Sequence, residues 1–280
     1  MRSLVLGHRG LIGNNIFREL IHRGEDVRID DNNSFDLDGG RSNVWSNILH
    51  YENPEVIYFC SANAHVDGCE KDEGTWIPNV SNTIKLIREA NLLGIRVVWF
   101  SSSYVFDGSY ELPNYENYVT NPINSYGRQK VAVENFMRLN NTVRKNTIIR
   151  TGGVFGARQV KKNNLLYQTL SLFEDVELKP VNDLYMFNPI SAALLAEQVV
   201  TLVSGGIYGL FHIGGMSSET RYSFALKLAD VLDKEAENYV SPSYEKGKVL
   251  RPVNGVLGSI YEFIQQPDTR TSLEIEMRLL

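Results

Sequence analysis

Residues 4–15 read LVLGHRGLIGNN, and this stretch decides the fold. Three apolar residues lead into Gly7, and further glycines follow at Gly10 and Gly13. Between a strand and a helix, such glycines permit a sharp turn, close approach of backbone to a pyrophosphate, and tight packing of the helix on the strand. The helix N-terminus adds free N–H groups and partial positive charge. The stretch therefore predicts a nucleotide-binding loop, although this spacing of glycines also suits an ordinary turn.

Short apolar runs alternate with longer helical patterns beyond this loop. We expect strands at 3–7, 26–30, 55–62, 95–103 and 146–152. We expect helices at 11–24, 44–51, 82–94 and 125–139, followed later by helices at 192–203 and 221–232 and a strand-like run at 206–215. This alternation is typical of a parallel sheet with helices on both faces.

The predicted fold class is therefore α/β, a Rossmann-type doubly wound parallel sheet with a smaller C-terminal substrate domain. We expect the dinucleotide-binding domain at 1–155, with 190–213 returning to it. The substrate-binding domain is expected at 156–189 and 214–280.

Composition excludes several classes of function. The chain has 280 residues and a net charge of −5, so it lacks the basic balance of a nucleic-acid-binding protein. No apolar run approaches the roughly 18 residues that a membrane-spanning helix needs. Cys60 and Cys69 have no metal-ligand spacing, and the opening MRSLVLG is too short for the apolar core of a signal peptide. We therefore expect a cytoplasmic protein with reduced thiols, no metal, and neither nucleic acid nor membrane as partner.

Two charged residues bear on the choice of coenzyme. Asp30, with Asp31, ends the second predicted strand, where a carboxylate can accept hydrogen bonds from the adenosine ribose and favour NAD. Arg9 lies inside the glycine loop and could instead reach the 2′-phosphate of NADP. The choice between NADH and NADPH stays open at this point.

Catalytic chemistry is expected at the carboxyl ends of the strands. Ser101, Ser102 and Ser103 end one predicted strand, and Tyr126 and Lys130 lie four residues apart on one face of the following helix. An ammonium beside a phenol lowers the pKa of the phenol, which would make Tyr126 a usable general acid or base. The sequence YEKGK at 244–248 repeats this spacing, but without a helical pattern or a preceding serine-ended strand, so we interpret it as coincidence.

Several further motifs lie in an order that resembles a known family. They are SSSYVFDG at 101–108, ANAHVDGCE at 62–70, RTGGVFG at 150–156 and RPVNGVL at 251–257. Together with the glycine loop and Tyr126/Lys130, they resemble the extended short-chain dehydrogenase/reductases, and within them the dTDP-4-dehydrorhamnose reductase family. The resemblance covers nearly the whole chain. The loop GHRGLIG itself is most similar to that of GDP-fucose synthases.

The resemblance implies an NAD(P)H-dependent reductase of a nucleotide-linked 4-keto-sugar, with Ser102, Tyr126 and Lys130 as catalytic residues. It implies a homodimer as one possible assembly, since dimers are common in this superfamily. The further coenzyme contacts that it implies are Leu11, Ile12, Asp36, Leu37, Cys60, Ser61, Ala62 and Asn79, the last helping to organise a proton relay or else capping a helix. The substrate contacts are His65, Ser103, Tyr104, Gly153, Phe155, Asn188 and Arg251, of which Arg251 could pair with a diphosphate.

Departures from the family pattern bear on the substrate. The family has Asp where this chain has Ser103 and Trp where it has Gly153, so we expect a keto-deoxysugar other than dTDP-4-dehydrorhamnose. Sugar dehydratases of this superfamily carry an Asp-Glu pair where Ser103-Tyr104 stands, and GDP-fucose synthases use a reactive cysteine and a histidine for epimerisation. A ketoreductase is favoured over these alternatives. A non-catalytic regulatory subunit, like that of methionine adenosyltransferase, stays open as a second class.

Overall fold

The predicted alternation of strands and helices builds one parallel sheet. The computed structural model describes residues 1–30, 37, 48–111, 113–139, 145–157, 164–264 and 268–280. Six of the described strands pair in the order β2-β1-β3-β4-β5-β9, and every pairing is parallel. Their bounds are β1 Arg2–Leu6, β2 Asp26–Ile29, β3 Val56–Phe59, β4 Arg96–Ser102, β5 Thr147–Thr151 and β9 Gly209–His212.

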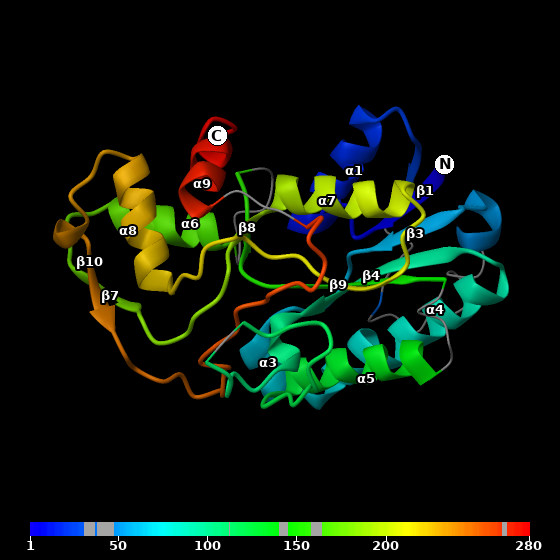
Figure 1. The fold of residues 1–280 in the computed structure, drawn as a ribbon, viewed down its shortest axis with the longest axis horizontal. Helices are drawn as coiled ribbons and strands as arrows, with labels where there is room; N and C mark the ends of the chain where they lie inside the picture. Colours follow the sequence, from blue (N-terminus) through cyan, green and yellow to red (C-terminus); the bar gives the residue numbers. More distant parts are fainter. Residues whose placement is uncertain (31–36, 38–47, 112, 140–144, 158–163, 265–267) are drawn as a thin grey trace.

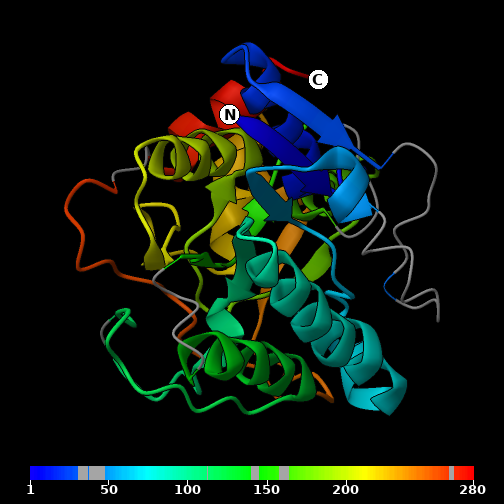
Figure 2. The ribbon, with the colours of Figure 1, turned by 90° about the vertical axis from the view of Figure 1, so that its right-hand side faces the viewer.

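Helices cover both faces of this sheet, as the apolar strands require. Figures 1 and 2 show α1 (Leu11–His22) and α7 (Ala192–Ser204) on one face, and α4 (Thr83–Leu92) and α5 (Ser125–Leu139) on the other. All seven residues of β4 are buried, because apolar side chains from both helix layers pack against it. The predicted Rossmann-type fold class is confirmed.

A smaller lobe lies beside one end of the sheet (Figure 1). Its own apolar core is centred on side chains such as Phe155, Phe224 and Leu273. The lobe contains α6 (Leu165–Leu170), α8 (Arg221–Val231), α9 (Thr269–Met277), and the parallel pair β7 (Lys179–Asn182) and β10 (Val240–Ser243). A second short pair, β6 (Val154–Phe155) and β8 (Ile190–Ser191), lies where the chain passes between the two bodies. The boundaries of the two domains stay a prediction.

The C-terminal part of the chain returns to the main sheet after leaving this lobe. Asn114 donates its backbone N–H to the Val256 carbonyl oxygen at 2.8 Å and accepts at its own carbonyl from Gly258 N at 2.9 Å. The Glu116 carboxylate accepts from the backbone N–H of His212 and of Ile260, both at 2.9 Å. A loop before α5 and the C-terminal segment are therefore joined to the edge strand β9.

Some elements differ from the prediction. The helix expected at 44–51 is described only from residue 48, where residues 48–52 are helical, and the rest of it lies outside the described residues. The α3 helix (Val66–Lys71) and a π-helical turn over Ile77–Asn82 were not predicted. None of the helices that the structure describes is long and apolar enough to cross a membrane.

Candidate active site and coenzyme loop

The predicted site residues gather at the carboxyl edge of the sheet. Gly7 directly follows β1, Ser61 follows β3 after one residue, and Ser102 ends β4. The strand order of the sheet reverses at β1. β2 lies on one side of β1, and β3 and all later strands of this sheet lie on the other. Open α/β sheets bind ligands in the crevice at such a point.

The glycine loop leaves no room for a β-carbon at Gly7 or at Gly13. Gly7 has a φ of +86°, which glycine adopts without strain, and a β-carbon there would lie 2.5 Å from Ser61 Oγ. A β-carbon on Gly13 would lie only 2.2 Å from the Gly7 carbonyl oxygen. Gly10 is the N-cap of α1, so no side chain covers the first N–H groups of this helix. The loop therefore fits a pyrophosphate at the helix N-terminus, as the sequence predicted for Gly7, Gly10 and Gly13.

The other residues expected near the coenzyme come from several segments, of which Cys60 and Ser61 lie against Gly7. Leu11 and Ile12 form the first turn of α1, and Cys60, Ser61 and Ala62 follow β3. Leu37 is buried, and its carbonyl oxygen accepts from Asn82 Nδ2 at 2.6 Å. Asp30 directly follows β2 and Arg9 is an exposed residue of the loop, while Asp31 and Asp36 lie outside the described residues.

Ser102, Tyr126 and Lys130 come together from β4 and α5. The Ser102 hydroxyl lies near the Tyr126 phenol and favours its ionised form. One turn farther along α5, Lys130 Nζ lies 5.5 Å from the centroid of the Tyr126 ring and donates to the Phe100 carbonyl oxygen at 2.8 Å. The i, i+4 spacing on a helix thus places the phenol and the ammonium on one face, beside the serine.

Burial changes the proton affinities of both groups on α5. It raises the pKa of the Tyr126 phenol above its ordinary value, an effect that the nearby Ser102 hydroxyl opposes. The net lowering of the Tyr126 pKa that the sequence predicted is therefore not found, because burial of the phenol outweighs the stabilisation of its ionised form. Burial also lowers the pKa of Lys130 to about 8, against the opposing effects of Cys69 and Glu134. Tyr126 therefore holds its proton at neutral pH, as a proton donor must.

Asn79 lies in the π-helical turn and joins the loop after β3 to α5. Its Oδ1 accepts from the Asn63 backbone N–H at 2.8 Å, and its Nδ2 donates to the Asn63 carbonyl at 2.9 Å and to Gln129 Oε1 at 2.7 Å. Gln129 Nε2 in turn donates to Thr75 Oγ1 at 2.8 Å. The amide of Asn79 is therefore engaged with protein groups, and its placement is that of a positioning residue. The N-caps of the adjoining helices are Trp76 and Asn82, so Asn79 is not a helix cap, and its part in a proton relay stays a prediction.

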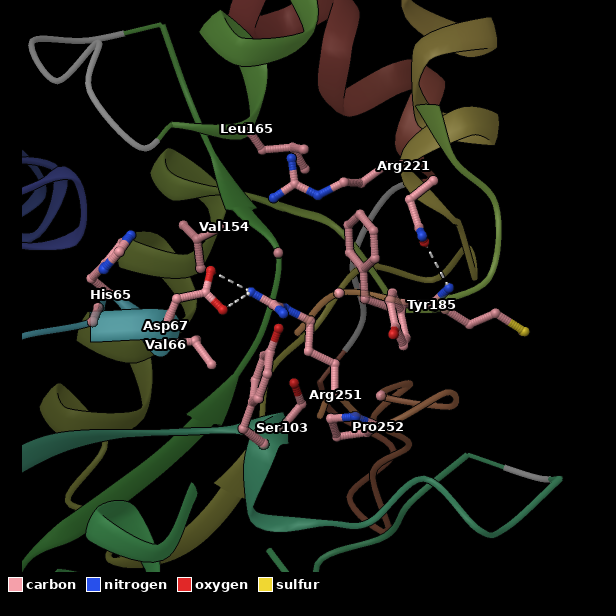
Figure 3. A pocket seen from close by; sticks show the side chains of 18 of the residues that line it. His65, Val66, Asp67, Ser103, Val154, Leu165, Tyr185, Arg221, Arg251 and Pro252 are labelled. Atoms are coloured by element: carbon pink, nitrogen blue, oxygen red, sulfur yellow. Dashed lines mark hydrogen bonds and ion pairs between the residues drawn. The ribbon is translucent and has the colours of Figure 1, made fainter. Parts of the chain in front are cut away.

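A cavity of about 960 Å³ opens between the sheet edge and the smaller lobe (Figure 3). Segments from both bodies line it, including the loop after β3, the end of β4, α6, α8 and the C-terminal segment. Five of the seven predicted substrate contacts line it: His65, Ser103, Tyr104, Gly153 and Arg251. The Tyr104 ring packs edge-on against Tyr126, with 5.9 Å between the centroids, so the cavity adjoins the group of Ser102, Tyr126 and Lys130.

Two predicted substrate contacts lie elsewhere. Phe155 is fully buried and packs against Phe224, at 5.2 Å between the ring centroids, in the core of the smaller lobe. Asn188 is buried as well, and its amide bonds to the backbone of Gly215 and Leu257. Both side chains hold segments together instead of facing the cavity, so we do not retain them as substrate contacts.

Two polar side chains at the cavity, His65 and Arg251, are bonded to other groups of the protein. His65 is the N-cap of α3, and its Nδ1 accepts from the Gly68 backbone N–H at 3.0 Å. Arg251 Nη2 lies 2.9 Å from each carboxylate oxygen of Asp67, as the dashed lines in Figure 3 show. This ion pair joins α3 of the main body to the C-terminal segment across the cavity.

A comparison of the whole chain with known families decides its membership. The family described as RmlD substrate binding domain matches residues 1–259. The chain belongs to this family. The predicted resemblance to dTDP-4-dehydrorhamnose reductases is thereby confirmed.

Individual members of the family are similar over most of the chain. A dTDP-4-keto-6-deoxy-D-glucose reductase of Streptomyces niveus is 30% identical over 260 residues, which cover 92% of this chain and 88% of the relative. The dTDP-4-dehydrorhamnose reductase of Escherichia coli strain K12 is 30% identical over 234 residues, covering 80% and 76%. The crystal structure of a dTDP-4-dehydrorhamnose reductase from Bacillus anthracis in complex with NADP has a TM-score of 0.89, at 23% identity, and covers 99% of each chain. This last likeness shows the shared fold.

A buried ionic network behind the catalytic residues was not predicted. Arg150 Nη2 lies 2.6 Å from Glu134 Oε2, and both side chains are almost fully excluded from solvent. Glu134 also accepts from the Ser101 hydroxyl at 2.6 Å, and Arg150 Nη1 lies 3.1 Å from His212 Nε2. Because His212 Nδ1 faces two carbonyl oxygens, it must carry the proton, which leaves Nε2 as an acceptor. Glu134 lies four residues after Lys130, and that spacing could have signalled the network in advance.

Three further residues that line the cavity were not predicted from the sequence. Asp67 was quoted only as part of a motif, Arg221 only as the start of a helix, and Phe187 not at all. Arg221 is the first residue of α8, directly after its N-cap Thr220, and this position gave no chemical signal in the sequence. Among the described residues, no group of three or more His, Cys, Asp or Glu side chains is placed to hold a metal ion.

Proposed function

We propose that this protein is an NAD(P)H-dependent oxidoreductase that reduces the carbonyl group of a nucleotide-linked 4-keto-deoxysugar. The observation that carries the proposal is the group Ser102, Tyr126 and Lys130 at the carboxyl edge of the sheet, between the glycine loop and a cavity of about 960 Å³. The similar reductases act on dTDP-linked keto sugars by their names, and one of the similar structures holds NADP. This chain's membership in their family supports the same reaction class.

The residues at the loop fit the coenzyme. The Gly7–Gly13 loop has no space for β-carbons at Gly7 and Gly13, and the N-terminus of α1 is free of side-chain caps. These features suit the pyrophosphate, while Ser61 and Leu11 lie where they would contact the nucleotide. When bound, NAD(P)H supplies the hydride that is added to the carbonyl carbon.

Tyr126 supplies the proton for the carbonyl oxygen. Since burial raises the pKa of this phenol, it stays protonated at neutral pH until negative charge develops on a substrate oxygen. The phenol then gives its proton to that oxygen, so that one hydride and one proton convert the ketone to an alcohol. Ser102 lies near the phenol, and its hydroxyl would donate to the same substrate oxygen.

Lys130 stabilises the phenolate that remains. Its ammonium lies 5.5 Å from the Tyr126 ring, close enough for a favourable charge interaction in a buried site. Its bond to the Phe100 carbonyl holds the side chain in place, and further ammonium protons remain for the nicotinamide ribose. Replacing Lys130 would therefore weaken both proton transfer and coenzyme binding.

The remaining details of the proposal concern the substrate and the setting of the protein. Ser103 and Gly153 line the cavity where the family pattern has Asp and Trp, which supports a sugar other than dTDP-4-dehydrorhamnose. Arg251 lines the cavity and is the residue expected to bind the diphosphate, in exchange for its present contact with Asp67. We further propose a cytoplasmic protein and a homodimer, the latter testable by light scattering of the purified chain.

A coenzyme titration followed by turnover tests the proposed function. Protein fluorescence is measured against NADH and NADPH, and oxidation of the bound coenzyme is then followed with dTDP-, UDP- and GDP-linked 4-keto-deoxysugars. We expect tight binding of at least one coenzyme and reduction of at least one sugar. Binding without any turnover, joined to stable association with another enzyme, would favour the regulatory-subunit alternative. Failure of both coenzymes to bind would overturn the proposal.

A further inference from the structure

Two arginine side chains reach into the cavity from separate segments of the smaller lobe. Arg221 begins α8, and Arg251 belongs to the C-terminal segment. Figure 3 shows both guanidinium groups directed into the same space, with Asp67 on the far side of Arg251. The Arg221 side chain is exposed to the cavity. Partial desolvation lowers the pKa of Arg221, and the charge of Arg251 adds to that effect, which places the two cations within electrostatic reach of one another.

The two guanidinium groups differ in how their charge is balanced. Arg251 donates to both oxygens of the Asp67 carboxylate at 2.9 Å and to the Val249 carbonyl at 3.0 Å. Arg221 Nη1 donates to the neutral amide oxygen of Gln168 at 3.0 Å. Within the part of the chain that the structure describes, no carboxylate lies within ion-pair distance of Arg221. Among the described residues, the cavity therefore contains an exposed guanidinium that is hydrogen-bonded to an amide and paired with no carboxylate.

Neighbouring guanidinium groups suit one chemical class of ligand above others. A guanidinium offers paired donors that match two oxygens of a carboxylate or a phosphate, and it keeps its charge at any physiological pH. Two such groups with like charge repel each other unless an anion lies between them. A diphosphate offers two linked anionic groups, one for each arginine, whereas a sugar hydroxyl does not require a cation.

We propose that Arg221 is a second diphosphate-binding residue, and that Asp67 is the carboxylate that the diphosphate displaces from Arg251. The inference rests on the proposed function, because it assigns the diphosphate of that nucleotide-linked sugar to named groups. Asp67 occupies the position on Arg251 that one phosphate takes in the complex. Arg221 exchanges its bond to Gln168 for bonds to the other phosphate.

The Asp67–Arg251 pair has the properties of a replaceable contact. The side chains keep 39% and 24% of their surface exposed, so water screens their attraction. A diphosphate carries more charge than one carboxylate and presents more oxygens, so it competes well for the same donors. Asp67 lies in the first turn of α3, whose N-cap His65 fixes the backbone there, so the proposal assigns the displacement to rotation of the Asp67 side chain.

Opposite effects of two substitutions test the inference. Calorimetry of the NADPH-bound protein gives dissociation constants for dTDP and for dTMP, the latter lacking the second phosphate. We expect Arg221→Gln to raise the dissociation constant of dTDP by about 10- to 100-fold, the range expected for loss of charged hydrogen bonds, and to change that of dTMP much less. We expect Asp67→Asn to lower the dissociation constant of dTDP severalfold, because Arg251 is then released.

Controls separate this inference from folding and from the proposed function. Arg138→Gln changes an exposed arginine at the end of α5, away from the cavity, and is expected to leave every constant unchanged. With dTDP-4-keto-6-deoxy-D-glucose as substrate, Arg221→Gln is expected to raise KM and to leave kcat nearly unchanged. The reason is that the diphosphate is bound equally in the ground state and in the transition state.

Each remaining outcome decides one proposal or the other. Wild-type turnover with equal dTDP affinity in Arg221→Gln overturns the role of Arg221 and leaves the reductase standing. Weaker dTDP binding in Asp67→Asn, with an unchanged melting temperature, overturns the displacement of Asp67. A wild-type protein that binds neither coenzyme nor dTDP overturns the proposed function instead.

Discussion

The ring of Phe187 occupies the space that a β-carbon on Gly153 would need. That β-carbon would lie 2.3 Å from Phe187 Cδ2, and Gly153 has a φ of +61°. Phe187 cannot easily move away, because its backbone exchanges hydrogen bonds with Glu219 at 2.7 and 2.8 Å. An aromatic wall of the cavity thus comes from a segment distant in sequence, and it requires glycine at position 153.

Gly153→Ala is therefore expected to destabilise the protein by more than the cost of its backbone conformation. Left-handed backbone costs alanine about 1–2 kcal/mol relative to glycine, and the clash with Phe187 adds to this. Gly24→Ala is the matched control, since Gly24 has a φ of +72° and open space around the missing β-carbon. Urea unfolding of both variants, and of Gly153→Ala combined with Phe187→Leu, measures the clash. Equal losses in the two single variants would contradict it.

Tyr126→Phe is expected to lower kcat by about 10²–10⁴-fold, because the variant has no proton to give to the substrate oxygen. Coenzyme binding should be retained, since the ring and its packing against Tyr104 remain. Tyr244→Phe is the control, because Tyr244 has the same spacing to a lysine but is exposed outside any helix. Steady-state oxidation of NADPH with a keto sugar checks both. A Tyr126→Phe variant with full activity would refute the assignment.

Gly13→Ala is expected to abolish coenzyme binding. Its β-carbon would lie 2.2 Å from the Gly7 carbonyl oxygen, so the loop and the start of α1 must move apart. Thermal unfolding with and without NADPH provides the measurement, since a ligand that binds only the folded state raises the melting temperature. Gly205→Ala serves as control, because Gly205 has an ordinary φ of −74°. A normal shift with NADPH in Gly13→Ala would contradict the pyrophosphate-binding loop.

Glu134→Gln is expected to cost about 3–5 kcal/mol of unfolding free energy, because it leaves the Arg150 charge buried without its partner. Asp230→Asn removes a carboxylate from an ion pair with Arg270 that lies on the surface, and we expect a loss of at most about 1 kcal/mol there. Urea denaturation at neutral pH measures both. Similar losses in the two variants would show that Arg150 finds another partner.

Stability is expected to rise between about pH 8 and pH 10 through Lys130. Burial lowers the pKa of this amine to about 8 in the folded protein, whereas the unfolded chain keeps the ordinary value of about 10.4. In that range the unfolded state binds the extra proton, so raising the pH favours the folded state. The difference in unfolding free energy between the wild type and Lys130→Met, followed across this range, isolates the effect. A difference that stays constant with pH would contradict the shift.

The main sheet could be predicted because its strands are apolar and its helices periodic. The strand expected at 95–103 is β4, and the helix expected at 125–139 is α5 with the same bounds. The glycine loop and the Tyr126/Lys130 pair depend on short spacings that a local structure preserves. These parts of the site follow from residues that are near one another in the chain.

The rest of the site depends on contacts between distant residues. Arg251 and Asp67 are 184 positions apart, and no periodicity signals their pairing. Phe155 was expected to face the substrate because its neighbours match a motif, yet the core of the smaller lobe buries it. The two-residue strands β6 and β8 are too short to leave a pattern in sequence. Tertiary packing decides such features, and a single sequence does not display it.

The return of the C-terminal segment to the loop at Asn114 and Glu116 constrains how this protein can be recombined with its relatives. An exchange of the smaller lobe alone would bring a foreign segment 254–260 against a native loop, at bonds that involve Val256, Gly258 and Ile260. Chimeras that transfer residues 114–116 together with the C-terminal segment keep these bonds within one parent. Substrate preference is therefore expected to move between family members only when both pieces are grafted as a unit.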